Sequence, residues 1–360
     1  MKVASVVGVR PQFIKASVVS RELRKKHEEV LIHTGQHYDY QMNKIFFDQL
    51  NIPEPDYHLE IGSGYHGYQT GEMLKKIEGV LIKEKPDLVL TYGDTNSTLA
   101  GALAASKLHI KTAHVESGLR SFDRSMPEEI NRILIDHCSD ILFCSTENAV
   151  ENLKKEGIEE NVYLTGDVMV DSLLYYMEIA EKKSNILSEL GLKSKEYLVA
   201  TVHRAGNTDN EIKLKEIVGA FSELNETIIF PLHPRTEKLL IKYGLYDMLK
   251  SSVVLTKPLG FFEFIKLMNH AKIILTDSGG VQKEAYILKV PCITLRENTE
   301  WIETVEDGWN VLVGSDKNKI ISIVNSFNPS LTNHCNRFGN GSSSAEIVSI
   351  LDEFSCYWNV

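Results

Sequence analysis

The stretch Ile273-Ile274-Leu275-Thr276-Asp277-Ser278-Gly279-Gly280-Val281-Gln282-Lys283-Glu284 carries the most information about the fold of this chain. An apolar run that is typical of a buried strand stops at Asp277-Ser278-Gly279-Gly280, and a helix-like segment follows. A turn of this kind presents backbone N–H groups and the positive end of a helix dipole at one point, where anions bind. Glu284 lies about one helical turn further on and is a candidate for binding ribose hydroxyls. An ordinary strand-to-helix turn without a ligand remains the alternative.

The same alternation of strand-like and helix-like segments runs along most of the chain. The predicted strands are residues 2–7, 29–33, 87–92, 111–115, 141–144, 197–202, 227–230, 253–255, 273–276 and 292–295. The predicted helices are residues 11–27, 40–50, 70–84, 97–108, 127–137, 147–156 and 343–354, with a mostly helical stretch at 165–194. Such alternation predicts parallel sheets of βαβ units. We therefore predict an α/β protein with two doubly wound, Rossmann-like domains, residues 1–168 and 169–342, facing a cleft, with the segment 343–360 packing back on the first.

Composition narrows the class of protein. The 360 residues suit two domains, and 43% hydrophobic with 24% charged residues is typical of a soluble globular protein. No apolar run reaches the roughly 18 residues of a membrane span, and residues 1–8 read as a strand rather than a signal peptide. Five widely spaced cysteines predict neither disulfides nor a zinc site and favour the cytoplasm. A net charge of −10 argues against nucleic acid, so an anionic ligand requires local positive groups.

Basic residues follow the first predicted strand. The chain there reads Gly8-Val9-Arg10-Pro11-Gln12-Phe13-Ile14-Lys15. The Arg10 guanidinium can bind a phosphate through two parallel hydrogen bonds, and Lys15 lies about one turn into the next helix. Cations at a helix N-terminus oppose the helix dipole, so their presence favours a functional role over a simple exposed pair.

Carboxylates follow later strands of the first domain. Asp94 and Glu116 come directly after two predicted strands, and Glu128 and Glu129 open a later helix. Because parallel strands end at one edge of their sheet, we predict that these side chains share that edge. Each has an ordinary alternative as a helix cap or a first-turn acid. Several carboxylates on one wall are costly unless they do acid–base work or meet cations, so a catalytic role is favoured.

Histidine and arginine occur together after two strands of the second domain, in His203-Arg204 and in His233-Pro234-Arg235. A single histidine is more often structural, but two at adjacent strand ends, each close to an arginine, favour an anion or sugar site. Together with the carboxylates, this pattern predicts that the second domain holds phosphates and the first acts on a sugar. A nucleotide-sugar would satisfy both.

A glycine pattern elsewhere requires a different interpretation. Gly62-Ser63-Gly64-Tyr65-His66-Gly67 matches the letters of a dinucleotide-binding loop, GxGxxG. The preceding residues 57–61 are too short and polar for the buried strand which that loop requires. We interpret the segment as a plain glycine loop and expect no nicotinamide cofactor. The sequence also has no tight histidine or cysteine cluster, so no metal is expected.

Six ordered blocks resemble the signature motifs of the non-hydrolysing UDP-N-acetylglucosamine 2-epimerases, from residue 1 to about residue 315. The blocks are Gly8-Val9-Arg10-Pro11, Gly93-Asp94-Thr95-Asn96, Glu116-Ser117-Gly118-Leu119-Arg120, Pro127-Glu128-Glu129-Ile130-Asn131-Arg132, His203-Arg204 and Asp277-Ser278-Gly279-Gly280. The resemblance implies two domains of the glycosyltransferase-B type, a C-terminal helix that crosses back, and a homodimer.

The resemblance also implies roles for individual residues. The catalytic residues would be Asp94, Glu116, Glu128 and His203. The substrate-binding residues would be Arg10, Lys15, His233, Phe264, Ser278, Gly279, Gly280 and Glu284. Within the second group, Arg10, Ser278 and Gly279 would contact the diphosphate. Glu284 would bind the ribose, and Phe264 would lie at the uracil.

The chemistry that the resemblance implies fits these residue types. UDP is eliminated across C1–C2 to give a 2-acetamidoglucal, and is then added back with the proton delivered to the opposite face of C2. Acid–base groups contribute about 10²–10⁴-fold to such steps, and the leaving diphosphate must be held by cations and N–H groups. The implied partner is a UDP-sugar, with no metal, nicotinamide, nucleic acid or membrane.

Departures from the family pattern leave the sugar open. Gln12 and Gly206 stand where glutamates are usual, and Trp301 stands where an arginine is usual. Tyr38, Asp39 and Tyr68 fall where regulated bacterial members bind an allosteric substrate. The variants look more like the subgroup that acts on UDP-2,3-diacetamido-2,3-dideoxyglucuronate, which would fit surface polysaccharide synthesis.

Three other classes share part of the pattern. A glycosyltransferase would have the same fold and the same UDP-binding residues, but it needs no carboxylates for chemistry at C2. A non-catalytic UDP-sugar-binding protein would keep Ser278 and Glu284 without the carboxylates. A hydrolysing epimerase would release free N-acetylmannosamine, and the Arg10-Pro11 start resembles the non-hydrolysing branch more closely.

Overall fold

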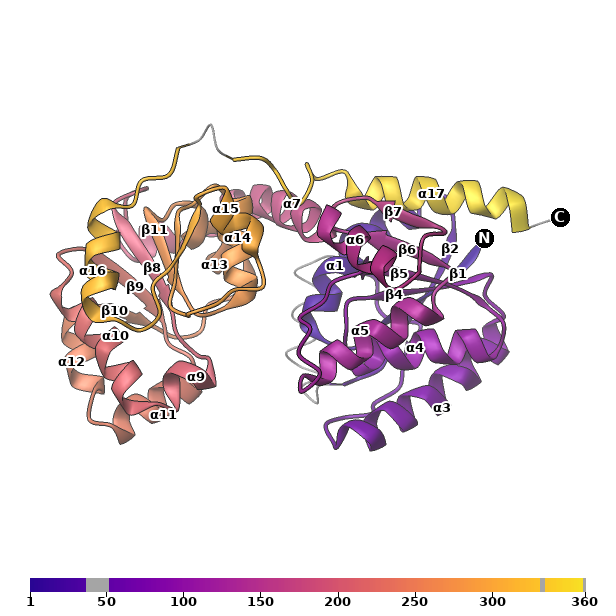
Figure 1. The fold of residues 1–360 in the computed structure, drawn as a ribbon, viewed down its shortest axis with the longest axis horizontal. Coiled ribbons are helices and arrows are strands. Elements are labelled where there is room, and N and C mark those ends of the chain that lie inside the picture. The colour runs from indigo at the N-terminus through magenta and orange to yellow at the C-terminus, as the bar shows by residue number, and fades with distance from the viewer. Residues whose placement is uncertain (37–51, 331–333, 359–360) are drawn as a thin grey trace. The chain divides into compact units, whose positions relative to one another are not determined.

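The computed structural model describes residues 1–36, 52–330 and 334–358. The chain forms two compact units (Figure 1): unit 1 is Met1–Ser172 with Arg337–Val360, and unit 2 is Leu173–Asn336. The division after Ser172 falls inside helix α7 (Val168–Lys183), a few residues from the predicted boundary at 168, and the return falls before 342. A helix, and not a loop, therefore carries the chain out of unit 1. The helix predicted at 40–50 lies outside the described residues, as do Tyr38 and Asp39.

Unit 1 is a parallel sheet with helices on both faces. Its seven strands have the order β3-β2-β1-β4-β5-β6-β7. They are β1 (Lys2–Val7), β2 (Glu28–His33), β3 (Tyr57–His58), β4 (Leu88–Tyr92), β5 (Lys111–Ser117), β6 (Ile141–Cys144) and β7 (Val162–Leu164). The helices are α1 (Arg10–Leu23), α3 (His66–Glu84), α4 (Asn96–Lys107), α5 (Pro127–Cys138), α6 (Glu147–Lys155) and α17 (Ser343–Trp358). Helices α3, α4 and α5 pack in a row, while α1 packs with α17 (Figure 1).

Burial on both faces explains the apolar runs in the strands of unit 1. Residues 3–7 of β1 and all of β4 are buried, as is usual where helices cover a parallel sheet. On one face, Val6 and Ile32 pack with Met73 and Ile77 of α3 and with the small Ala104 of α4. Helix α17, in the segment expected to return to the first domain, belongs to unit 1 and packs against α1.

Unit 2 repeats the architecture with six strands in the order β10-β9-β8-β11-β12-β13. These are β8 (Tyr197–Thr201), β9 (Thr227–Pro231), β10 (Val254–Thr256), β11 (Ile273–Thr276), β12 (Cys292–Thr294) and β13 (Asn310–Leu312). The helices are α8 (Ile186–Glu189), α9 (Ala205–Thr208), α10 (Glu211–Glu223), α11 (Pro234–Lys242), α12 (Tyr246–Ser252), α13 (Phe261–Asn269), α14 (Gly279–Ile287), α15 (Ile302–Glu306) and α16 (Lys317–Ser326). Its core joins β8, β9 and β11 to α10, α12 and α16.

The strand orders locate the sites at which ligands can bind. In both sheets the described strand pairs are parallel, so the carboxyl ends of the strands share one edge. The order reverses between β1 and β4 in unit 1 and between β8 and β11 in unit 2. Loops that leave neighbouring strands at such a switch point turn in opposite directions, and the crevice between them is where doubly wound sheets bind ligands.

The prediction from sequence missed three short strands and placed the end of helix α1 too late. Strands β3, β7 and β13 are only two or three residues long and carry too little periodicity to be detected. Helix α1 stops at Leu23 rather than 27, since Arg24-Lys25-Lys26 offers no apolar side chain to bury. Within the described residues, none of the helices has the length and apolar character needed to cross a membrane.

Candidate active site

A bulge at the end of β5 presents the Glu116 side chain. The register between β5 and β6 shifts between Val115 and Ser117, so Glu116 is the extra residue, and its φ of 76° lies in the left-handed region. β-Bulges re-aim a side chain, and a left-handed non-glycine residue is strained. The half-buried Glu116 carboxylate forms an ion pair with Lys15 Nζ from the second turn of α1. Two predicted site residues, 101 positions apart, are thereby in direct contact.

Asp94 lies on the neighbouring strand end. Its Oδ2 accepts hydrogen bonds from Arg132 Nε at 3.0 Å and Nη2 at 2.7 Å, and its carbonyl accepts from Asn131 Nδ2 at 2.9 Å. Gly93, just before it, has a φ of 66°, and a Cβ there would stand 3.3 Å from both Glu116 Oε2 and Lys15 Nζ. Glycine therefore lets β4 end close to the Lys15–Glu116 pair. The predicted gathering of carboxylates at one edge is confirmed for Asp94 and Glu116, and each has a cationic partner.

The structure separates Glu128 from Glu129. Glu129 is 1% exposed and accepts hydrogen bonds from the backbone N–H groups of Ser121 and Phe122, both at 2.8 Å, and from Arg132 Nη1 at 2.8 Å. Glu128 is exposed in the first turn of α5, and no described residue forms a hydrogen bond or ion pair with it. Glu129 therefore holds the loop before α5, whereas the Glu128 carboxylate stays available for chemistry.

Arg10 and Gln12 differ in exposure although both lie in the first turn of α1. Arg10 is exposed directly after β1. Gln12 is 1% exposed; its Oε1 accepts from the Gly8 N–H at 2.8 Å, and its Nε2 donates to the Tyr92 carbonyl at 2.8 Å. The side chain joins the ends of β1 and β4 through both ends of its amide. The Gln12 amide, which stands where a glutamate is usual in the family, therefore has a structural role at the strand ends.

A buried aspartate organises the switch point of unit 2. Asp277 is 0% exposed and follows β11. Its carboxylate accepts hydrogen bonds from the backbone N–H of His203 at 3.1 Å, from that of Arg204 at 3.0 Å, and from Asn207 Nδ2 at 3.1 Å. This carboxylate therefore holds the loop after β8 against the loop after β11. No role was predicted for Asp277 from the sequence, although an acid between a buried strand and a glycine-containing turn can indicate a carboxylate that binds backbone N–H groups.

The two predicted histidines lie side by side. The rings of His203 and His233 have centroids 5.9 Å apart. Partial enclosure by the protein lowers the pKa of His203, and Asp277 opposes this shift while His233 adds to it. The net result is a ring that is neutral at pH 7 and able to accept a proton. His233 Nδ1 accepts a hydrogen bond from the Arg235 N–H at 3.2 Å, so it also caps α11.

The turn at residues 277–280 joins a strand to a helix, as predicted. Ser278 is the N-cap of α14, and its side chain makes no capping hydrogen bond. Gly279 and Gly280 form the first turn, and the half-buried Glu284 lies in the second. A Cβ on Gly279 would lie 3.2 Å from Glu300 Oε2, 3.5 Å from Arg204 Nη2 and 3.6 Å from Trp301 Nε1. Glycine therefore leaves room at a helix N-terminus that faces a carboxylate, an arginine and an indole.

Charged residues surround Trp301. Lys283 Nζ lies 4.3 Å from the centroid of the indole, within the range of a cation–π interaction. The neighbouring Glu300 accepts a hydrogen bond from Arg296 Nη1 at 2.9 Å and lies 3.5 Å from Arg204 Nη2. Lys283, Arg204 and Arg296 thus lie against Trp301 or Glu300, and the Asp277 carboxylate lies directly before the N-terminus of α14.

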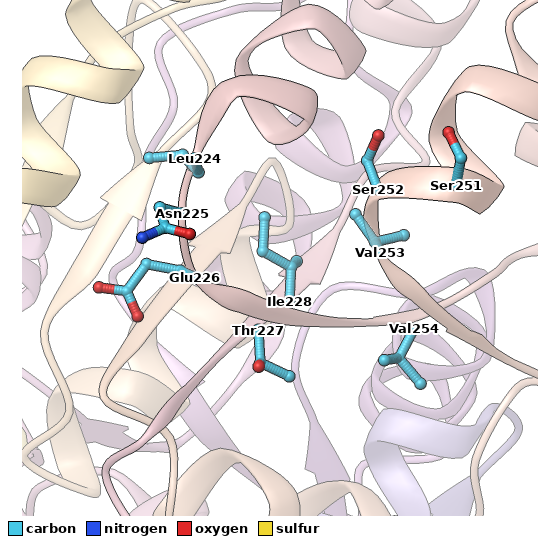
Figure 2. A pocket seen from close by; sticks show the side chains of 9 residues that line it. All are labelled: Leu224, Asn225, Glu226, Thr227, Ile228, Ser251, Ser252, Val253 and Val254. Carbon is cyan, nitrogen blue, oxygen red and sulfur yellow. The ribbon is translucent and has the colours of Figure 1, made fainter.

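The two edges of the sheet in unit 2 differ: Phe264 lies near the carboxyl edge, and a hollow lies at the opposite edge. Phe264 is half-buried in the first turns of α13, which follows β10 and so begins at the carboxyl edge of the sheet. A hollow of about 430 Å³ lies at the opposite edge, where β9 and β10 begin (Figure 2). Its lining of Asn225, Glu226, Ser251 and Ser252 includes none of the predicted site residues. The carboxyl edge, and not this hollow, carries the candidate chemistry.

Comparison with known proteins identifies the family. Residues 21–352 match the family model described as UDP-N-acetylglucosamine 2-epimerase. The chain belongs to this family of isomerases. A protein of Methanococcus maripaludis named UDP-N-acetylglucosamine 2-epimerase homolog is 62% identical over 98% of this chain and 99% of its own length. The family assignment confirms the resemblance seen in the six sequence blocks.

Two further relatives bear on the substrate. The crystal structure of the Methanocaldococcus jannaschii UDP-GlcNAc 2-epimerase in complex with UDP-GlcNAc and UDP superposes with a TM-score of 0.86 at 52% identity, over 98% of this chain and 100% of that one. A UDP-2,3-diacetamido-2,3-dideoxy-D-glucuronate 2-epimerase of Pseudomonas aeruginosa is 48% identical, over 98% of this chain and 99% of its own length. The fold prediction of two Rossmann-like units is confirmed, and members of this family act on more than one sugar.

Proposed function

We propose that the protein is a non-hydrolysing UDP-N-acetylglucosamine 2-epimerase, which interconverts UDP-GlcNAc-type and UDP-ManNAc-type sugars. The observation that carries this proposal is the pair of carboxylates at the carboxyl edge of the sheet in unit 1. Asp94 and Glu116 come from adjacent strands, are held by Arg132 and Lys15, and stand at the edge where doubly wound sheets bind ligands. A UDP-sugar-binding protein without C2 chemistry has no use for this arrangement.

The carboxylates would supply acid–base catalysis at C2. Inversion requires removal of a weakly acidic C2–H on one face of the ring and return of a proton on the other. We assign these transfers to Asp94, Glu116 and Glu128, either directly or through a water molecule. Elimination of UDP accompanies the first transfer and gives a 2-acetamidoglucal, so that no free carbanion forms. Re-addition of UDP to C1 accompanies the second, and the chemistry balances without an oxidant.

Unit 2 would hold the nucleotide throughout. We assign the diphosphate to the N-terminus of α14 at Ser278, Gly279 and Gly280, where backbone N–H groups and the helix dipole favour anions. His203 has an uncharged ring at pH 7, so it suits a hydrogen bond to a phosphate oxygen or proton transfer as UDP leaves. Glu284 is assigned to the ribose hydroxyls, and Phe264 is assigned to the uracil. Arg10 and His233 are proposed as further phosphate-side or sugar-side groups.

The diacetamido-uronate is a second candidate for the sugar. The Pseudomonas aeruginosa relative named for that substrate is 48% identical to this chain. Trp301 stands where the family usually has an arginine, and its ring contacts Lys283. An indole could pack against a second acetamido group, and the cations nearby would tolerate a sugar carboxylate. We further propose a homodimer that works in the cytoplasm, with a product used for surface polysaccharide synthesis.

One experiment tests the activity and the choice of sugar together. The enzyme is incubated separately with UDP-GlcNAc and with UDP-2,3-diacetamido-2,3-dideoxyglucuronate, and the C2 configuration is followed by proton NMR. We expect a new anomeric signal of the C2 epimer with at least one of them, in an equilibrium mixture that still carries UDP. Release of a free sugar instead would indicate a hydrolysing enzyme, and no reaction with either sugar would overturn the proposal.

A further inference from the structure

A chain of buried charged side chains lies behind the two carboxylates of unit 1. His114, on β5, is 0% exposed. Its Nδ1 lies 2.7 Å from Asp136 Oδ1, and its Nε2 lies 2.8 Å from the Gly93 carbonyl oxygen. Both ring nitrogens therefore lie within hydrogen-bond distance of an oxygen atom, and the imidazole bridges the Asp136 side chain of α5 and the end of β4.

Asp136 extends this chain to the end of β5. Its Oδ2 accepts hydrogen bonds from the Gly118 N–H at 3.1 Å and from Arg120 Nη1 at 2.7 Å. Burial raises the pKa of the Asp136 carboxyl, but its bonds to His114 and Arg120 outweigh burial and hold that pKa below its usual value. Arg120 in turn donates to both oxygens of Glu156, each at 2.7 Å. We call these four side chains, His114, Asp136, Arg120 and Glu156, the buried relay.

The buried relay is attached to the backbone on both sides of the candidate carboxylates. His114 holds the Gly93 carbonyl, directly before Asp94, and Asp136 holds the Gly118 N–H, two residues after Glu116. All three positions Gly93, Glu116 and Gly118 have left-handed backbones, with φ of 66°, 76° and 77°. Glycine adopts this region readily, whereas Glu116 is strained there and keeps its conformation only because the surroundings determine it. The relay thus ties the end of β4 and the strained end of β5 to the buried Arg120–Asp136 ion pair.

We propose that His114 and Asp136 are positioning residues for proton transfer at C2. They touch no substrate atom; they hold the backbones that carry Asp94 and Glu116, and so set the spacing of the two carboxylates. Misplacement of an acid–base group by about 1 Å is enough to cost a hundredfold in rate. The inference rests on the proposed function, since it requires that these carboxylates do acid–base work.

The test compares two replacements of His114 with a control on the same strand. His114→Asn keeps a donor near the Nδ1 position and loses the bond to Gly93, whereas His114→Gln keeps a donor near Nε2 and loses the bond to Asp136. The control is Thr112→Val. Thr112 is also fully buried and lies two residues earlier on the same side of β5. Its hydroxyl donates a long hydrogen bond of 3.4 Å to the Ile110 carbonyl, and its backbone bonds to Asp140 are unaffected by the change to valine. The measurements are kcat and KM with whichever UDP-sugar the wild type converts, C2 deuterium incorporation, UDP affinity by calorimetry, and Tm.

We expect His114→Asn to lower kcat and the rate of C2 deuterium incorporation by about 10²-fold, with UDP affinity unchanged within about twofold. His114→Gln should lose less, because the Gly93 peptide keeps its donor. Thr112→Val should keep kcat even if its Tm falls as far. A folded His114→Asn with kcat within threefold of wild type, or a Thr112→Val that loses as much kcat, would overturn the inference.

A second variant tests the proposed positioning role if His114→Asn does not fold. Glu156 lies at the outer end of the buried relay, and its side chain is 27% exposed, so Glu156→Gln leaves the core intact. It weakens the anchor of Arg120, and we expect kcat to fall about three- to tenfold at constant UDP affinity. Full kcat in Glu156→Gln would then overturn the inference. A wild type that epimerises neither sugar overturns the proposed function and this inference with it, whereas active wild type with unaffected variants overturns the inference alone.

Discussion

Two adjacent glutamates at the start of α5 allow a sharp test of the site. The same substitution should lower stability at one position and catalysis at the other. Glu128→Gln and Glu129→Gln each remove a charge with little change in shape. Glu129 is buried and accepts four hydrogen bonds from Ser121, Phe122 and Arg132. Glu128 is exposed and has no such partners among the described residues. We expect Glu129→Gln to act on stability and Glu128→Gln to act on catalysis.

The size of the stability effect follows from the contacts of Glu129. A glutamine keeps one acceptor oxygen, and its amide nitrogen then faces a backbone N–H, at Ser121 or at Phe122. A buried donor left without a partner costs about 1–3 kcal/mol, and the remaining bonds lose their ionic character, so we expect a loss of about 2–4 kcal/mol. In a folding unit of roughly 200 residues this corresponds to a fall in Tm on the order of 10 °C. Glu128→Gln should stay within about 0.5 kcal/mol of wild type.

The pH dependence of stability provides an independent check. Burial raises the pKa of Glu129, but the hydrogen bonds from Ser121, Phe122 and Arg132 prevail and hold it below its usual value of 4.5. A carboxyl whose pKa is depressed by folding stabilises the protein above its unfolded pKa, and this contribution disappears as the pH falls through the folded value. The difference in unfolding free energy between wild type and Glu129→Gln should therefore be constant from pH 6 to 8 and shrink below about pH 4.5.

The assays are thermal unfolding followed by circular dichroism and steady-state epimerisation followed by NMR. Glu128→Gln should keep its Tm and lose at least about 10²-fold in kcat, the usual contribution of a general acid or base. A Glu128→Gln enzyme with near-normal kcat would show that this carboxylate does not take part in proton transfer. A Glu129→Gln protein with the Tm of wild type would refute the structural role that the buried contacts assign to Glu129.

Four further predictions concern the mechanism and the substrate. Asp94→Asn and Glu116→Gln should each lower kcat by at least about 10²-fold with little change in UDP affinity, and normal turnover in both would make these carboxylates structural. Turnover in D₂O should place deuterium at C2 of the product without added nicotinamide, and NMR that finds no solvent deuterium would contradict elimination and re-addition. Glu284→Ala should weaken UDP binding by roughly 1–3 kcal/mol and reduce the preference over 2′-deoxy-UDP, so unchanged calorimetric values would remove Glu284 from the ribose. Trp301→Arg should shift the ratio of kcat/KM values towards UDP-GlcNAc by about tenfold, or ~1.4 kcal/mol, and a constant ratio would exclude Trp301 from sugar selection.

Much of the fold could be predicted because the relevant forces act locally. Each strand of a parallel sheet that is covered on both faces must be apolar over most of its length, so β1, β6 and β11 are visible in the sequence within a residue or two of their bounds. The alternation with helices then predicts parallel pairing and one shared carboxyl edge. Short edge strands such as β3 bury little and leave no such trace.

The candidate site could be predicted only in part. Residue types at strand ends pointed to Asp94, Glu116 and Ser278, because topology brings all carboxyl ends of a parallel sheet to one edge. The chemistry of the residues alone did not distinguish Glu128 from Glu129, since both are first-turn acids, and only the family resemblance singled out Glu128. Their difference arises from the loop at Ser121 and Phe122, which folds back onto one of them.

The sequence by itself determined the class of the protein, its two-domain α/β plan and its family, because these depend on periodicity and on ordered motifs. Only the tertiary structure decided which polar residues hold the fold. Asp277 and Glu129 carry the same carboxylate group as Asp94 and Glu128, and Gln12 lies two residues from Arg10, yet all three are buried with polar atoms bound to backbone groups. The reason is physical: burying a polar side chain is tolerable only when partners far apart in the sequence satisfy it, and those partners exist only once the chain has folded.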